Sequence, residues 1–265
     1  MINLAIIGAS GRMGCALIRA ASDWPTLRLV SAVVSATSPA LGRDAGELAG
    51  TGALGVLATS DLSAALTDAD VAVDFSKGQA TQAIVTACER ARVALLVGTT
   101  GHPELESAFA AASNMIPLLV APNTSVGSAL LLELVREAAR MLPAQFDIEV
   151  IEAHHRGKRD APSGTALALA RAAAEAGGRN FDPSGALPSD TAPRRFGEIA
   201  IASIRAGDIV GEHTVLFAGS GERLSLTHAA TDRAIFAHGA LRAAAWLASK
   251  PPGRYFMRDV IRLES

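Results

Sequence analysis

Short apolar runs alternate with helical patterns along the first half of the chain. Runs with the length and composition of strands occur at positions 4–7, 27–34, 71–75, 94–97 and 117–120. Stretches with helical spacing of apolar residues lie between them, at positions 13–21, 62–67, 80–91 and 104–112. Most of the strand candidates are apolar on both faces, which is typical of a parallel sheet that helices cover on both sides. The alternation predicts an α/β domain with a Rossmann-like, doubly wound parallel sheet. Positions 35–57 are rich in Gly, Ser and Pro and are expected to form a long excursion.

The pattern changes after about residue 125. Helices are predicted at 129–141, 166–176 and 234–248. Strands are predicted up to Glu152 and then at 199–205, 213–217 and 223–227. A connection rich in Gly, Pro and Ser spans 177–193, and a short tail follows the last helix. Consecutive strands with no helix between them indicate a second domain of α+β type, built on an antiparallel or mixed sheet.

The composition and charge of the chain exclude several classes of function. The chain has 265 residues, of which 49% are hydrophobic, and this suits one large core or two modest ones. Its formal net charge of −2 gives no basis for a nucleic-acid or membrane-surface role. No apolar run reaches the roughly 18 residues that span a bilayer, and the N-terminus lacks the basic flank of a signal peptide. Cys15 and Cys88 are the only cysteines, so neither a disulfide framework nor a cysteine metal cluster is expected. We expect a cytoplasmic protein.

A glycine-rich turn follows the first strand candidate. The sequence GASGRMG, from Gly8 to Gly14, leads directly into the first helix. Glycines at such a turn let the backbone approach a pyrophosphate, whose charge then lies at the helix N-terminus. The spacing G-x-x-G-x-x-G is a looser relative of the usual dinucleotide fingerprint, and such a turn can also be purely structural. Its place at the head of an α/β alternation favours dinucleotide binding.

The end of the second strand candidate bears on cofactor preference. A carboxylate usually follows this strand and binds the ribose hydroxyls of NAD. Here the sequence reads Val-Val-Ser-Ala-Thr, with no acidic residue. Ser35, Thr37 and Arg12 are able to contact a 2′-phosphate, which favours NADPH or the use of either cofactor. The alternative is that backbone amides bind the ribose and the preference is slight.

Three further strand candidates end in small or hydroxylated residues. These ends read Asp74-Phe75-Ser76-Lys77, Val97-Gly98-Thr99-Thr100-Gly101 and Ala121-Pro122-Asn123-Thr124-Ser125. Open α/β sheets bind ligands at the carboxyl ends of their strands. Such residues are also ordinary turn formers, but three such turns on one edge favour a site with room for a nicotinamide ring.

The second domain contains a basic loop, EAHHRGKRDAPSGT, at 152–165. Its two adjacent histidines alone are a weak signal for a metal, and no metal is expected. Arg156, Lys158 and Arg159 exclude a core position, which leaves a solvated surface loop or an anion site. Pro162-Ser163-Gly164-Thr165 begins a helix whose first amides can face an anion. Cations beside a helix N-terminus predict a carboxylate or phosphate site.

These motifs together resemble the 4-hydroxy-tetrahydrodipicolinate reductase (dihydrodipicolinate reductase) family of bacterial lysine biosynthesis. The matching stretches are G-x-x-G-R-M-G, V-G-T-T-G, A-P-N-T-S-V-G, E-A-H-H-R-x-K-x-D-A-P-S-G-T-A, the run from Arg205 to Thr214, Gly221-Glu222, Thr227-His228 and Phe236-Ala-x-Gly-Ala240. The resemblance covers the whole chain. It implies a homotetramer in which residues 1–125, completed by 235–265, bind the dinucleotide. Residues 126–234 would then bind the substrate and form the subunit contacts.

The resemblance also implies roles for individual residues. His154 would donate or accept a proton, Lys158 would be a second proton donor, and His155, Gly164 and Thr165, with Ser163 of the same block, would bind a substrate carboxylate. The residues implied to line NADPH or NADH are Gly8, Ala9, Ser10, Gly11, Arg12, Met13, Ser35, Phe75, Lys77, Gly98, Thr99, Thr100, Ala121, Pro122, Asn123 and Thr124. Lys77 replaces a more familiar arginine. Val34-Ser35 stands where some members have Glu-Arg, which leaves the cofactor preference open.

The implied reaction is the reduction of a cyclic dicarboxylate imine with loss of its 4-hydroxyl as water. One rival is another two-domain NAD(P)-dependent dehydrogenase, such as one acting on a semialdehyde. A phosphorylating version would need a catalytic cysteine, and neither Cys15 nor Cys88 is placed for that role. The other rival is a non-catalytic dinucleotide sensor, which would not need to keep His154 and Lys158.

Overall fold

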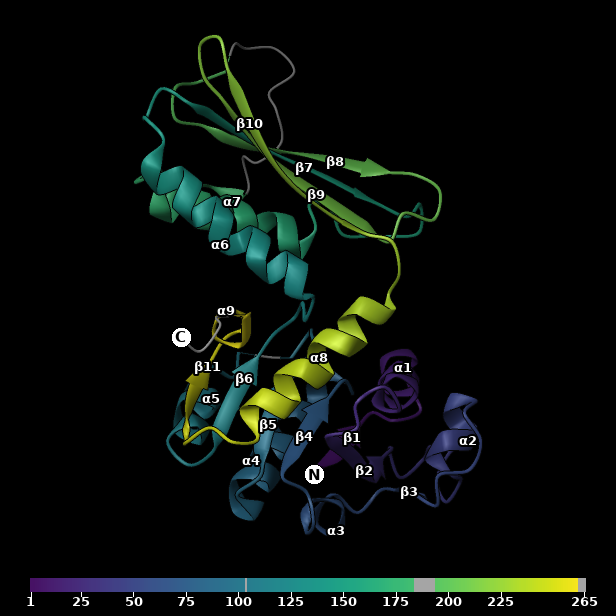
Figure 1. The fold of residues 1–265 in the computed structure, drawn as a ribbon. Helices are drawn as coiled ribbons and strands as arrows, with labels where there is room; N and C mark the ends of the chain where they lie inside the picture. Colours follow the sequence, from purple (N-terminus) through teal and green to yellow (C-terminus); the bar gives the residue numbers. More distant parts are fainter. Residues whose placement is uncertain (103, 184–193, 262–265) are drawn as a thin grey trace. The chain divides into compact units, whose positions relative to one another are not determined.

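The computed structural model describes residues 1–102, 104–183 and 194–261. The chain divides into two compact units, which are Met1–Val126 with Ala234–Ser265, and Gly127–Arg233 (Figure 1). We call them unit 1 and unit 2 and describe each by itself.

Unit 1 is built on a parallel sheet of seven strands among the described residues, in the order β11-β6-β5-β4-β1-β2-β3. The strands are β1 (Ile2–Ile7), β2 (Leu27–Val33), β3 (Ala58–Thr59), β4 (Val71–Asp74), β5 (Ala94–Val97), β6 (Pro117–Val120) and β11 (Gly253–Tyr255). The chain adds strands on one side of β1 first and then crosses to β4 on the other side. The carboxyl ends of β1 and β4 therefore form the switch point of the sheet, where this class of fold binds ligands.

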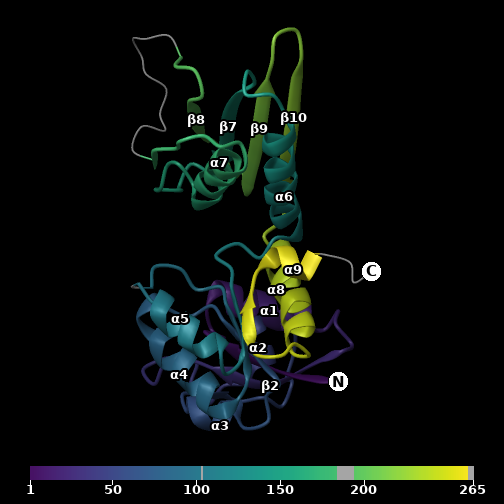
Figure 2. The same cartoon turned by 90° about the vertical axis from the view of Figure 1, so that its left-hand side faces the viewer.

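Helices cover both faces of this sheet. On one face α1 (Arg12–Ala21) packs against α8 (Ala234–Leu247), which also contacts β4, β5 and β6. On the other face lie α3 (Leu62–Leu66), α4 (Thr81–Ala91) and α5 (Glu106–Ser113), as Figure 2 shows. Every residue of β4 and of β5 is buried. This two-sided burial explains why β5 is apolar throughout and why β4 is apolar up to its last residue, Asp74, and it confirms the predicted Rossmann-like fold.

Two segments contain more regular structure than their composition predicted. The excursion at 35–57 contains α2 (Ala45–Ala49), and β3 follows it. Asp44 caps α2 and accepts hydrogen bonds from the amides of Gly46, Glu47, Leu54 and Gly55, so one buried carboxylate orders the segment. The predicted tail forms β11 and α9 (Met257–Ile261), because β11 pairs with the edge strand β6. That pairing is a long-range contact that local composition does not reveal.

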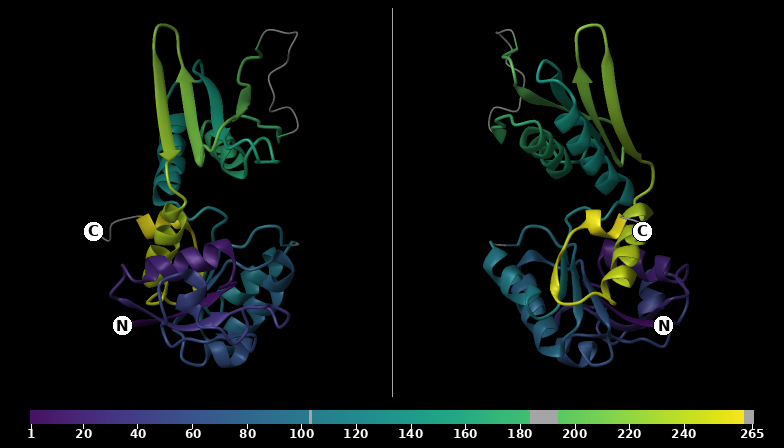
Figure 3. Two further views of the ribbon diagram at one scale, coloured as in Figure 1. Left: turned by 90° about the vertical axis from the view of Figure 1, so that its right-hand side faces the viewer. Right: turned by 60° about the vertical axis from the view of Figure 1, so that its left-hand side comes forward.

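Unit 2 contains a mixed sheet with the order β10-β9-β7-β8, as predicted. Its strands are β7 (Asp147–His154), β8 (Ile199–Arg205), β9 (Gly211–Ala218) and β10 (Arg223–Ala230). β7 runs parallel to β8 and antiparallel to β9. The helices α6 (Val126–Met141) and α7 (Gly164–Ala176) pack on the same face of the sheet (Figure 3). Part of the predicted connection at 177–193 lies outside the described residues.

Candidate active site

The candidate site of unit 2 lies at the carboxyl end of β7. The helix-facing side chains of this strand are first apolar, at Ile148 and Val150, and then polar, at Glu152 and His154. All four are buried, and Glu152 is fully inaccessible. The strand continues two residues past its predicted end at Glu152, so both polar residues project from rigid strand and not from the loop.

Register places further polar residues beside this pair. Glu152 is paired with His213 on β9, which is paired with His228 on β10. His154 is paired with Arg205 on β8. Side chains in such a row project from the same face of a sheet, and here that face carries α6 and α7. The sheet thus collects titratable groups from four strands at the start of α7.

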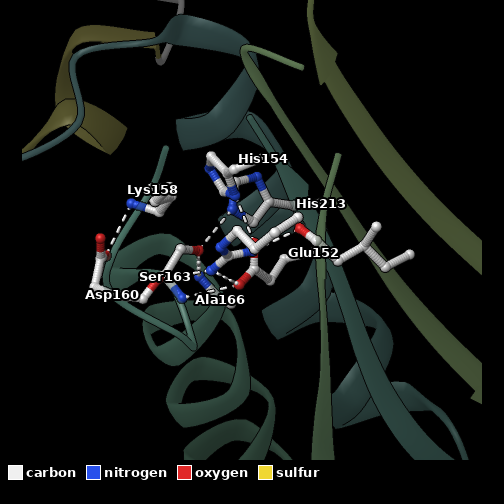
Figure 4. A network of polar contacts seen from close by, with 9 residues as sticks. Glu152, His154, Lys158, Asp160, Ser163, Ala166 and His213 are labelled. Carbon is white, nitrogen blue, oxygen red and sulfur yellow. Dashed lines mark hydrogen bonds and ion pairs between the residues drawn. The ribbon is translucent and has the colours of Figure 1, made fainter. Parts of the chain in front are cut away.

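Glu152 is the centre of the resulting network (Figure 4). Its Oε2 accepts a hydrogen bond from Nη1 of Arg205 at 2.9 Å, and its Oε1 accepts one from Nη2 of Arg205 at 2.7 Å. Oε2 also lies 2.5 Å from Nδ1 of His154, and Oε1 accepts a bond from the amide of Ser163 at 3.2 Å. Burial alone would raise the pKa of Glu152, but the bonds from Arg205 and His154 outweigh it and lower the pKa to about 2. Glu152 is therefore a carboxylate near neutral pH.

His154 has the opposite balance. Burial lowers its pKa below the usual value, although the hydrogen bond to Glu152 favours the charged ring. Lys158 and Arg205 lower it further. His154 is 8% exposed and is neutral at pH 7. A neutral imidazole at this position is able to take up a proton when negative charge arrives nearby.

Ser163 joins the helix to the sheet. Its hydroxyl accepts a hydrogen bond from the amide of Ala166 at 3.2 Å, which makes Ser163 the N-cap of α7. The same hydroxyl lies 3.0 Å from Nε2 of His213. The ring of His213 makes an edge contact with His154, with centroids 5.1 Å apart. The hydroxyl of Ser163 is thus buried and already engaged, as is its amide, which donates to Glu152.

The other predicted substrate contacts surround this network. Lys158 lies on the loop after β7, with Nζ 2.8 Å from Oδ2 of Asp160. Its amide donates to the carbonyl of His155 at 3.0 Å, which forms the turn between them. Gly164 is exposed at the first position of α7, and the side chains of His155 and Thr165 are partly exposed. The structure therefore places Lys158 on the loop after β7, and Gly164 and Thr165 in the first turn of α7.

Unit 1 contains the predicted glycine turn at the switch point of its sheet. Gly8 has a φ of +85°, and a Cβ there would lie 2.6 Å from the carbonyl oxygen of Phe75. A Cβ on Gly14 would lie 2.2 Å from the carbonyl oxygen of Gly8. Gly11, the N-cap of α1, makes no side-chain cap. The turn is therefore tightly packed and presents backbone to the helix start, which is the arrangement that a pyrophosphate requires.

The remaining residues predicted to bind the cofactor differ in their exposure and in the groups that are available to a ligand. Ser10, Arg12, Ser35, Lys77, Thr100 and Pro122 are exposed, whereas Met13, Phe75 and Asn123 are partly buried. Ala9, Gly98, Thr99, Ala121 and Thr124 are buried. Thr99 Oγ1 donates to the carbonyl of Asp74 at 3.3 Å, and Thr124 Oγ1 donates to that of Phe236 at 2.7 Å. These two hydroxyls form hydrogen bonds within the protein and support the loops. The buried residues therefore have only their backbone groups to offer a ligand.

Sequence reasoning missed the roles of Glu152, Arg205 and His213. Arg205 and His213 lie 53 and 61 positions after Glu152, respectively, and strand register brings all three together. The sequence did contain an indication, because the helix-facing positions of β7 begin with the apolar residues Ile148 and Val150 and continue with Glu152 and His154. In the described ranges 1–102, 104–183 and 194–261, no group of three or more His, Cys, Asp or Glu side chains is placed to hold a metal. Within these ranges, no helix has the length and apolar character needed to cross a bilayer.

Comparison with known proteins agrees with this architecture. The family model described as "Dihydrodipicolinate reductase, N-terminus" matches residues 2–124, and the model described as "Dihydrodipicolinate reductase, C-terminus" matches 127–261. The chain is 50% identical to 4-hydroxy-tetrahydrodipicolinate reductase of Alkalilimnicola ehrlichii, over 98% of this chain and 99% of the relative. It is 48% identical to the enzyme of the same name from Anaeromyxobacter dehalogenans strain 2CP-1, over 99% of this chain and 98% of the relative.

A solved structure gives the same result. Dipicolinate-bound dihydrodipicolinate reductase from Paenisporosarcina sp. TG-14 superposes with a TM-score of 0.76 at 25% identity, covering 97% of each chain. Both sequence and fold therefore match along the whole length. The chain belongs to the dihydrodipicolinate reductase family.

Proposed function

We propose that this protein catalyses the NAD(P)H-dependent reduction of 4-hydroxy-2,3,4,5-tetrahydrodipicolinate to 2,3,4,5-tetrahydrodipicolinate, with loss of water, in lysine biosynthesis by the diaminopimelate pathway. One observation carries the proposal, namely the meeting of a buried neutral histidine, a lysine and a helix start in unit 2. His154, Lys158 and the amides of α7 together suit an anionic substrate that must gain a proton.

The substrate is a dianion, and this matches the charge of the site. The N-terminus of α7 suits a carboxylate because of the helix dipole, and Gly164 at its first position is exposed. Lys158 adds a full positive charge that Asp160 only partly offsets, because the Asp160 side chain is 61% exposed and screened by solvent. The solved relative carries dipicolinate, a dicarboxylate. We assign the substrate carboxylates to the start of α7 and to Lys158, with His155, Gly164 and Thr165 beside them.

Proton delivery follows from the electrostatics of His154. In the free protein burial keeps this ring neutral. A dianion bound next to it favours the imidazolium and raises the pKa of His154, so the ring takes up a proton on substrate binding. The charged ring is then able to deliver that proton to the reduced ring of the substrate. Lys158 stabilises the negative charge and is a second donor.

The reduced nicotinamide cofactor, when bound, supplies the hydride. The glycine turn of unit 1 fits its pyrophosphate, since a Cβ at Gly8 or Gly14 would collide with backbone and Gly11 leaves the start of α1 uncapped. We assign its binding to this turn, to the 98–100 and 121–124 loops, and to Phe75 and Lys77. Arg12 and Ser35 are exposed at the sheet edge where a 2′-phosphate would lie. We therefore propose that NADPH is used at least as well as NADH.

We further propose that the protein is a cytoplasmic homotetramer, as the family resemblance implies. The face of the unit 2 sheet opposite α6 and α7 exposes apolar side chains, with Ile151 37% and Ile204 48% exposed. A face of this kind suits a subunit contact. Sedimentation of the purified protein at micromolar concentration tests this assembly, and a monomer would contradict it.

An absorbance assay tests the proposed reaction. The purified chain is mixed with the hydroxylated ring substrate and NADPH, and the loss of reduced cofactor is followed. We expect turnover that depends on both reagents. Cofactor oxidation with a semialdehyde in place of the ring substrate would support the rival dehydrogenase, and cofactor binding without any turnover would support the sensor.

A further inference from the structure

The side chain of Glu152 is surrounded by hydrogen-bond donors and can only accept hydrogen bonds from them. Both of its oxygens receive hydrogen bonds from Arg205, and Oε1 receives another from the amide of Ser163. A guanidinium and a backbone amide are donors that cannot accept. Paired in this way, a fully buried carboxyl group stays ionised and has no proton to donate.

This arrangement determines the hydrogen on His154. Nδ1 lies 2.5 Å from Oε2 of Glu152. Since the carboxylate can only accept, Nδ1 must carry the hydrogen and donate it. In the neutral ring the lone pair then lies on Nε2. Gly211 on β9 lies beside that atom, where a Cβ would be 3.1 Å from Nε2, so glycine keeps this space open.

We infer that Glu152, clamped by Arg205, is a positioning residue that holds His154 in the Nδ1–H tautomer and thereby makes Nε2 the atom that exchanges a proton with the substrate. The inference rests on the proposed function of His154 and adds two residues to it. Arg205 acts through Glu152, and Glu152 acts through His154. Neither needs to touch the substrate.

The alternative is that this ion pair only stabilises unit 2. Arg205 also donates to the carbonyl of Asp160 at 2.6 Å, so it does link β8 to the loop after β7. A structural role would leave the tautomer of His154 and the pH dependence of the reaction unchanged. These two properties therefore separate the alternatives.

The charged and titratable groups that act on His154 come from three strands and one loop. Glu152 lies on the same strand, Arg205 on β8, His213 on β9 and Lys158 on the loop that follows β7. Glu152 is the anion among these named groups and stabilises the charged form of His154. Replacing it with a neutral residue should therefore lower the pKa of His154. His154 is proposed to act as a proton donor, so its pKa sets the alkaline limb of the kcat/KM profile, and this limb should then move to lower pH.

Nitrogen-15 NMR of histidine-labelled protein provides the direct test, with the signals of His154 assigned by their absence in His154→Gln. In the wild type we expect Nδ1 protonated and Nε2 unprotonated at pH 7.5. In Glu152→Gln the amide oxygen accepts from Arg205, so the amide NH₂ points at Nδ1 and the hydrogen moves to Nε2. A wild-type ring with its hydrogen on Nε2 would overturn the inference without any variant having to fold.

Kinetics complete the test. Glu152→Gln should lower kcat about 100-fold or more, because the tautomer is wrong for proton exchange at Nε2. KM should change less than about 3-fold, and the alkaline limb should shift as described. Glu175→Gln is the matched control, since it removes an arginine contact on α7, to Arg136, far along the helix from its start. Wild-type kcat in Glu152→Gln would contradict the inference, whereas an inactive wild type with the expected tautomer would contradict only the proposed reaction.

Discussion

The hydroxyl of Ser163 lies 3.0 Å from Nε2 of His213, and it links the first turn of α7 to the central strand β9. The hydroxyl already accepts from the amide of Ala166, so its own hydrogen is available to His213. This bond matches a neutral His213, whose pKa is lowered to about 4 by burial and by the neighbouring His154. One side chain thus caps the helix and satisfies a buried histidine.

Ser163→Ala should destabilise the protein by about 1–3 kcal/mol. The variant removes an N-cap and leaves Nε2 of His213 buried without its donor. Urea unfolding followed by circular dichroism measures the loss. Ser249→Ala, at an exposed serine that donates to a nearby carbonyl, is the control and should change stability by less than about 0.5 kcal/mol. Equal stability of the two variants would contradict the role given to Ser163.

Acid should destabilise the fold through His213 before it affects Glu152. The folded pKa of His213, about 4, lies below its unfolded value of about 6.5, so protons bind preferentially to the unfolded chain in this window. His213 therefore contributes stability above pH 6.5 that is lost as the pH falls to 4, about 3 kcal/mol in all. Glu152, with a folded pKa of about 2, adds a further loss below about pH 4.5. Unfolding midpoints between pH 7 and 4.5 should show a smaller pH dependence in His213→Asn than in the wild type.

His154→Gln and Lys158→Ala should each lower kcat at least 100-fold, because each removes a proton donor. Cofactor binding should stay within about 2-fold of the wild type, since the glycine turn lies in unit 1 and both residues lie in unit 2. Steady-state kinetics and NADPH fluorescence titration measure the two effects. Wild-type turnover in either variant would remove that residue from the mechanism.

Gly164→Leu should impair substrate binding and spare the fold. A Cβ at Gly164 meets no other heavy atom within 4 Å, and the residue is exposed at the first position of α7. The side chain would instead occupy the space over the helix start, where we place a substrate carboxylate. We expect KM to rise about 10-fold with Tm within about 2 °C of the wild type. A normal KM would place the carboxylate elsewhere.

Asp160→Asn should strengthen substrate binding at low salt. Asp160 pairs with Lys158, and this lysine holds the pKa of the Asp160 carboxyl below its usual value. Without the carboxylate, Lys158 is free for the dianion, and we expect KM to fall about 2- to 5-fold, the equivalent of an exposed ion pair. The difference should shrink at 0.5 M salt because of screening. A KM unaffected at both salt concentrations would show that Lys158 does not bind the substrate.

Local patterns were sufficient for the architecture. The strands β1, β5 and β6 form apolar runs, and the helix α1 begins where glycine allows a close turn. Both signals depend on neighbours in the chain, so they are readable without a structure. The Rossmann-like fold and the mixed second sheet were predicted from such patterns and are confirmed. The family was predicted from the resemblance of several motifs and is also confirmed. The site residues taken from the motifs remain predictions that the experiments above test.

What only the tertiary structure decided is the environment of those residues. The sequence alone determined that a histidine, a lysine and a helix start are close along the chain, because they occupy 12 consecutive positions from His154 to Thr165. It did not determine that Glu152 is ionised or that His154 is neutral. Those states depend on burial and on Arg205 and His213, which lie on strands more than 50 positions away and meet β7 through backbone hydrogen bonds. Strand register is set by the packing of a whole sheet, and so the charge of the site is a property of the fold.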